Sequence, residues 1–95
     1  MSSMTGRAYA VTEITNQRGL HARASAKFVE AVARYACEIT VTKDGTSVSG
    51  RSIMGLMMLG AGKGSTVELL AEGNDAQAAM RELLDLIRSK FHEDQ

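Results

Sequence analysis

The first third of the chain changes from an alternating to a helical pattern of apolar residues. Over residues 7–14, "RAYAVTEI", apolar and polar side chains roughly alternate, which is typical of a half-buried strand. The polar stretch "TNQRG" follows and predicts a loop. Apolar residues then recur at helical spacing at Leu20, Ala24, Phe28, Val32 and Tyr35. This stripe predicts an amphipathic helix with one face in the core.

The middle of the chain predicts a β-hairpin followed by a short helix. In "CEITVTKDGTSVSG" we expect strands over residues 38–42 and 46–49, because the intervening D-G pair readily adopts the positive φ values of a tight turn. Ser52 is a suitable N-cap for a helix that runs through Leu59, and Gly60 is a suitable terminator.

The last third predicts one more strand and one more helix. Residues 65–73, "STVELLAEG", have the composition of a half-buried strand, and Asn74 or Asp75 can cap the helix that follows. The apolar stripe of that helix comprises Ala76, Met80, Leu83, Leu84, Ile87 and Phe91. The order βαββαβα predicts an α+β fold in which helices cover one face of an antiparallel sheet.

Composition narrows the possible functions. The 95 residues fit a single domain (residues 1–95), and 11 basic and 11 acidic residues cancel. Zero net charge and only four aromatic residues disfavour nucleic acid and anionic membranes as partners. A single cysteine and the absence of a signal-peptide or membrane-span pattern predict a soluble cytoplasmic protein. The two histidines and one cysteine lack metal-ligand spacing, so we expect neither metal nor cofactor.

His21 is the main candidate for chemistry. It precedes the first predicted helix, where unpaired backbone N–H groups and the helix macrodipole favour a bound anion such as phosphate. An imidazole with a neutral ring nitrogen is a nucleophile at cytosolic pH, and the nearby Arg23 can donate to phosphoryl oxygens. The alternative is that His21 is only a capping or solvated residue, and Gly19 favours the first interpretation slightly because it permits a sharp bend.

The short helix in "RSIMGLMMLG" is apolar over most of its circumference, which predicts either a protein-docking surface or a fully buried helix. Two motifs near it are rejected. "GAGKGST" lacks the P-loop pattern, because Met57 and Gly64 stand where glycine and Ser or Thr are needed. "GRSIMG" misses the nucleophile elbow of serine hydrolases by one residue.

Two motifs together resemble the HPr family, the histidine phosphocarriers of the bacterial phosphoenolpyruvate-dependent phosphotransferase system. They are "GLHARASAKFV" and, some thirty residues later, "KDGTSVSGRSIMGLMMLGAGKGSTVEL". The resemblance implies an open-faced β-sandwich, a four-stranded antiparallel sheet with three helices on one face. It also implies a monomeric carrier rather than an enzyme, which takes a phosphoryl group from Enzyme I and passes it to enzyme II A-type domains.

The resemblance also assigns roles to residues. His21 would be the phosphoryl acceptor through its pros nitrogen, with Arg23 and Ala22 binding the phosphate. Ser52 would be the regulatory site of an HPr kinase/phosphorylase. The partner-docking surface would comprise Leu20, Met54, Leu56 and Met57.

One departure from the family pattern concerns the first helix. The motif H-x-R-P has Ala24 in place of proline, which predicts a looser first turn and one additional N–H donor. "EITN" and "FHED" resemble the nitrogen-regulatory branch, whereas Ser52 and its flanks resemble the sugar branch, and the branch stays open. A non-catalytic docking module, or a carrier inactivated by Ala24, is the alternative function.

Overall fold

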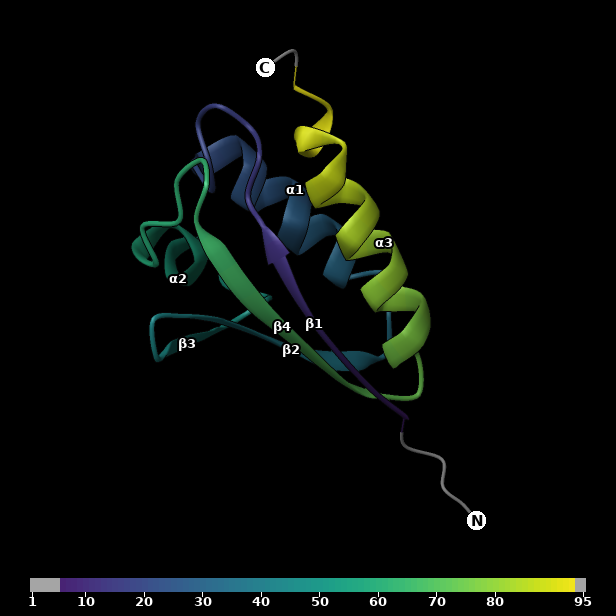
Figure 1. Cartoon of the computed structure of the whole chain (residues 1–95). Coiled ribbons are helices and arrows are strands. Elements are labelled where there is room, and N and C mark those ends of the chain that lie inside the picture. The colour runs from purple at the N-terminus through teal and green to yellow at the C-terminus, as the bar shows by residue number, and fades with distance from the viewer. Residues whose placement is uncertain (1–5, 94–95) are drawn as a thin grey trace.

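The computed structural model describes residues 6–93, in which four antiparallel strands form one sheet in the order β1-β4-β2-β3. The strands are β1 (Gly6–Glu13), β2 (Cys37–Lys43), β3 (Thr46–Ser49) and β4 (Thr66–Gly73). The helices are α1 (Ala22–Val32), α2 (Ile53–Met58) and α3 (Ala76–Arg88), followed by a short 3-10 turn, η1 (Lys90–His92). This arrangement confirms the predicted open-faced βαββαβα fold with its helices on one face of the sheet (Figure 1).

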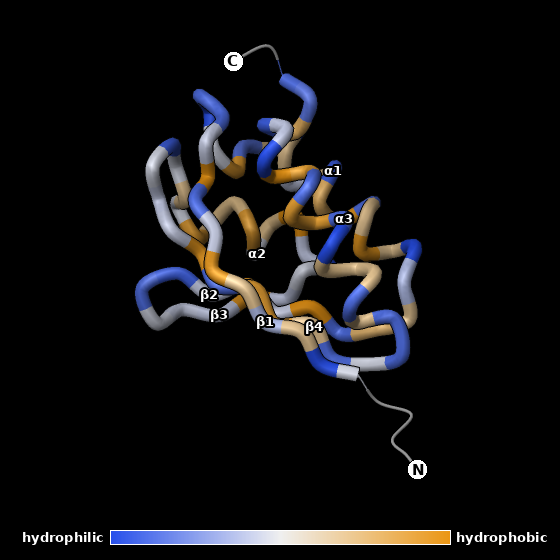
Figure 2. The backbone as a smooth tube through the Cα atoms, turned by 45° about the vertical axis from the view of Figure 1, so that its right-hand side comes forward, coloured by the Kyte–Doolittle hydropathy of each residue, from blue (hydrophilic) through white to orange (hydrophobic). Residues whose placement is uncertain are grey.

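The core lies between the sheet and the helices. In β4, the side chains of Val67, Leu69 and Ala71 alternate with exposed or half-buried neighbours, and all three are buried. Such a period of two places one side of a strand in the core and leaves the other side in solvent. Phe28 of α1 and Leu83 of α3 cover this layer, and the hydrophobic parts of the tube gather there in Figure 2.

Two predicted helices end earlier than their apolar stripes suggest. Helix α1 ends at Val32, because the Arg34 and Tyr35 N–H groups bond three residues back rather than four, as in the 3.1 Å bond from Tyr35 N–H to Val32 O. The placement of Tyr35 in the helix was therefore wrong. Helix α3 ends at Arg88, and Phe91 lies beyond it in η1 with a φ of 56°. Phe91 is nevertheless fully buried, so periodicity identified its burial but not its backbone.

The residues predicted to cap or terminate helices behave differently in the structure. Ser52 is the N-cap of α2, and its Oγ accepts a 2.9 Å hydrogen bond from the Gly55 N–H. Gly60 follows α2 with a φ of 67°, as a helix terminator should. Asp75 occupies the N-cap position of α3, but its carboxylate accepts a 2.8 Å bond from the Ala36 N–H instead. That side chain joins α3 to the segment before β2 rather than capping its own helix.

The Ser52→Ala variant is expected to lose about 1 kcal/mol of unfolding free energy, the usual value of an N-cap side chain. The acceptor for the Gly55 N–H disappears, and α2 has only six residues over which to offset that loss. Urea denaturation measures the effect. Ser52→Asp is the matched control, because aspartate is an equally good N-cap and should restore most of the stability. Equal losses in both variants would contradict the capping role.

Candidate functional site

Backbone geometry places His21 at the N-terminal end of α1. Gly19 turns the chain with a φ of 63°, and the Leu20 N–H donates a 2.9 Å hydrogen bond to Ala61 O in the loop before β4. His21 then takes an extended conformation as the N-cap, and the Ser25 N–H donates to His21 O at 2.8 Å to begin the helix. The predicted position of His21 and the predicted bend at Gly19 are confirmed.

The first turn of α1 offers unpaired donors. Within residues 6–93, no hydrogen bond occupies the backbone N–H groups of Ala22, Arg23 or Ala24. Such groups point out of the N-terminal end of a helix and, with the macrodipole, attract an anion. Ala24 is fully buried and supplies the N–H that a proline would lack. The looser first turn expected from alanine in place of proline at position 24 stays a prediction.

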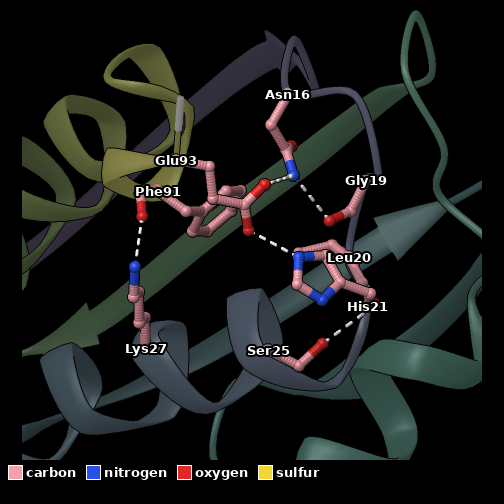
Figure 3. A network of polar contacts seen from close by, with 8 residues as sticks. All are labelled: Asn16, Gly19, Leu20, His21, Ser25, Lys27, Phe91 and Glu93. Carbon is pink, nitrogen blue, oxygen red and sulfur yellow. Dashed lines mark hydrogen bonds and ion pairs between the residues drawn. The ribbon is translucent and has the colours of Figure 1, made fainter. Parts of the chain in front are cut away.

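The His21 ring contacts a carboxylate from the other end of the chain. Its Nε2 lies 2.5 Å from Glu93 Oε2, and the Asn16 amide Nδ2 donates to Glu93 Oε1 at 3.1 Å and to Gly19 O at 2.8 Å (Figure 3). The side chains of His21 and Glu93 are only 17% and 13% exposed. Water therefore competes little with this contact.

The protonation of this pair follows from its surroundings. Burial alone would raise the pKa of the Glu93 carboxyl, but hydrogen bonds from His21 and Asn16 and the charges of His21 and Lys27 hold it below its ordinary value. Glu93 is therefore ionised at neutral pH and only accepts hydrogen bonds. It follows that Nε2 of His21 carries a proton, and within the described part of the chain no hydrogen bond involves Nδ1.

A cleft of about 410 Å³ surrounds the ring. Its lining residues are Gln17, Arg18, His21, Arg23, Lys27, His92 and Glu93. Three permanent cations, Arg18, Arg23 and Lys27, thus face one carboxylate, which suits a doubly charged phosphoryl group. The structure brings Arg23 and His21 into one cleft, as their sequence spacing suggested.

The predicted docking surface is only partly exposed. Met54 and Met57 of α2 are 67% and 41% exposed, but Leu56 is fully buried and Leu20 is nearly so. The assignment of Leu20 and Leu56 to a docking surface is therefore corrected, because both side chains pack in the core. Ile53 and Met58, which the sequence analysis did not assign, are exposed instead. Leu56 is the buried residue of α2 and most of the helix is exposed, so a fully buried helix, one of the two predicted alternatives, is wrong.

Three residues of the site were missed from the sequence. Asn16 was included in a predicted loop, and neither Lys27 nor Glu93 was assigned a role. The Lys27 ammonium donates a 2.5 Å hydrogen bond to Phe91 O, and Asn16 is fully buried. The available signal was Phe91, an apolar residue near the end of the chain whose burial must draw the tail onto the core.

Two kinds of site find no support among residues 6–93. No group of three histidine, cysteine, aspartate or glutamate side chains there is arranged to hold a metal ion. No helix in the same residues has the length and apolar character needed to cross a bilayer.

Comparisons with known proteins point to one family. The family model described as the PTS HPr component phosphorylation site matches residues 10–89. A phosphocarrier protein HPr of Neisseria meningitidis is 52% identical over 81 residues, which cover 85% of this chain and 91% of the relative. That of Cupriavidus necator is 48% identical over 82 residues, covering 86% and 92%. The solved HPr-C-His structure of Thermoanaerobacter tengcongensis matches with a TM-score of 0.89 at 44% identity, covering 93% and 99%.

Proposed function

The chain belongs to the HPr family of phosphocarrier proteins of the phosphotransferase system, and on that premise we propose that His21 accepts a phosphoryl group from Enzyme I. The group then passes to a histidine of an enzyme II A-type domain. One observation carries the proposal: the His21 ring lies at the N-terminus of α1 in a cleft lined by three cations, and its Nδ1 makes no hydrogen bond to any of residues 6–93.

The proposed chemistry needs a positioned nucleophile and an electrostatic cradle. The lone pair of Nδ1 attacks phosphorus, and the transferred oxygens are bound by the Ala22 N–H, the neighbouring first-turn N–H groups and the Arg23 guanidinium. These groups hold the phosphoryl but do not activate water toward it. A partner supplies the second histidine and completes the surroundings, so the protein is a carrier rather than a stand-alone catalyst.

The exposed residues of α2 support partner docking beside this cleft. Ile53, Met54, Met57 and Met58 are all at least 41% exposed, and Met57 also lies beside His21 in a smaller hollow. Flexible thioether side chains suit a surface that binds several differently shaped partners. Enzyme I and the acceptor domains would use this surface in turn, and a kinase/phosphorylase acting on Ser52 would modify its edge.

Incubation with phosphoenolpyruvate and a bacterial Enzyme I tests the proposal by intact mass. We expect one added phosphoryl group that is lost in acid, because a phosphoramidate on histidine is acid-labile whereas a serine ester is not. Transfer onward to an added enzyme II A-type domain should restore the original mass. A folded chain that stays unmodified with both sugar-branch and nitrogen-branch Enzyme I would overturn the carrier function.

The docking-module alternative rests on the same exposed α2 residues. In that case the protein binds partners through Met54 and its neighbours, and His21 serves only as an N-cap position without a capping bond. Binding of an acceptor domain by a chain that Enzyme I never modifies would favour this second function. Loss of binding in a Met54→Asp variant would locate the surface in either case.

A further inference from the structure

The last described turn of the chain has an unusual backbone. Lys90, Phe91 and His92 have φ values of 59°, 56° and 60°, so three successive non-glycine residues are left-handed. Each such residue costs roughly 1–3 kcal/mol and persists only where the surroundings determine it. The chain therefore turns at η1 because other contacts hold it there.

Those contacts direct one carboxylate at His21. Phe91 is buried in the core, and the Lys27 ammonium bonds its carbonyl oxygen. Beyond this anchor, Glu93 has both oxygens engaged, Oε1 by Asn16 and Oε2 by His21. The strained turn thus fixes the direction of a charged side chain 72 residues away from its partner in sequence.

We propose that Glu93 is a positioning residue for His21, whose carboxylate keeps the ring proton on Nε2 and thereby makes Nδ1 the nucleophile. The proposal rests on the proposed carrier function and deepens it, because it identifies what selects the reacting nitrogen. Asn16 fixes the orientation of the carboxylate, because its side-chain N–H donates a hydrogen bond to Glu93 Oε1 and leaves Oε2 facing the ring. A similar carboxylate orients histidine in serine protease triads.

The balance of the transfer step shows why the charge of Glu93 matters. The Nδ1 lone pair forms the new N–P bond while the bond between phosphorus and the donor nitrogen breaks, and its electron pair returns to the donor ring. Because the Nε2 proton stays in place, the His21 ring gains positive charge as the bond forms. Glu93 faces that charge at 2.5 Å, and Arg18, Arg23, Lys27 and His92 line the same cleft, where they would face the phosphoryl oxygens.

The Glu93→Gln variant tests whether the carboxylate sets the tautomer of His21. Asn16 donates a hydrogen bond to the position of Glu93 Oε1. A glutamine would therefore place its carbonyl oxygen there and point its amino group at His21. That amino group needs an acceptor, which favours the lone pair on Nε2 and moves the ring proton to Nδ1. We expect ¹⁵N NMR of the His21 ring above its titration range to show mainly the Nε2–H tautomer in the wild type and mainly Nδ1–H in Glu93→Gln.

Phosphorylation rates should follow the tautomer rather than the shape of the side chain. We expect Glu93→Gln to slow transfer from Enzyme I at least about 100-fold, since the wrong tautomer costs roughly 10⁴-fold in a protease triad. Glu93→Ala, which imposes no tautomer, should be slowed less. A merely structural role predicts the opposite order, because glutamine fills the same space and alanine does not.

Glu82→Gln is the matched control, because that carboxylate on α3 bonds Arg34 and Tyr35 and not His21. The His21 tautomer and the phosphorylation rate of Glu82→Gln should equal those of the wild type. An unchanged tautomer in folded Glu93→Gln, or a smaller loss for Gln than for Ala, would overturn the inference. Absence of phosphorylation in the wild type would instead overturn the carrier function, and the NMR comparison requires no Enzyme I.

Discussion

The His21→Ala variant is expected to accept no phosphoryl group from Enzyme I under conditions that modify the wild type completely. The reason is chemical: His21 is the N-cap of α1, next to the N–H groups proposed to bind the phosphoryl oxygens, whereas the other imidazole of the cleft, His92, lies in η1. The fold should survive, because the His21 side chain lies partly at the surface, 17% exposed, and within residues 6–93 its one hydrogen bond is to Glu93. Intact mass and circular dichroism measure the two properties.

His92→Ala is the control for this experiment. His92 is the second histidine of the chain, it is exposed, and it lines the same cleft. Full modification of His92→Ala with none of His21→Ala would assign the acceptor to one ring. Acid-labile phosphoryl on His21→Ala would contradict the assignment, and its loss in both variants would indicate damage to the cleft rather than to the nucleophile.

The Gly19→Ala variant is expected to lose about 2–5 kcal/mol of unfolding free energy. An alanine at a φ of 63° costs roughly 1–2 kcal/mol on its own. Its Cβ would also lie 2.3 Å from Ala61 O and 2.7 Å from Gly62 Cα, and both are backbone atoms that cannot rotate away. Overpacking of this kind adds about 1–3 kcal/mol. Urea or thermal denaturation measures the loss.

Gly60→Ala separates the two contributions. Gly60 has a nearly equal φ of 67°, but a Cβ there would meet no atom within 4 Å. Its loss should therefore reflect the left-handed conformation alone and be smaller by the cost of the contact. Equal losses at both positions would mean that the loop before β4 does not pack against Gly19, and the support of His21 by the Leu20–Ala61 hydrogen bond would then be in question.

Patterns confined to one element were predictable from the sequence. The hairpin strand β3 has the predicted bounds, because a D-G turn and a period of two are both local signals. Ser52 as an N-cap and Gly60 as a terminator follow from the bonding and conformational limits of a helix end. The position of His21 before α1, and hence its place beside the first-turn N–H groups, was predictable for the same reason.

Contacts between distant elements were not predictable from periodicity. An apolar residue in a short helix is equally consistent with docking and with burial. The sequence therefore assigned Leu56 to the docking surface and left Met58 unassigned, whereas the structure buries Leu56 and exposes Met58. Asp75 has the composition of a cap, but a backbone N–H from another segment competes for its carboxylate.

The sequence by itself determined the order of the elements and the placing of His21 and Arg23 at the start of α1, because each depends on residues a few positions apart. Only the tertiary structure decided that the Nε2 of His21 faces a carboxylate. Glu93, held by Asn16, reaches the ring because burial of Phe91 folds a strained turn back across the end of α1. Whether burial of an apolar side chain offsets the strain of a turn depends on a balance of free energies, and the spacing of residues in one sequence does not reveal that balance.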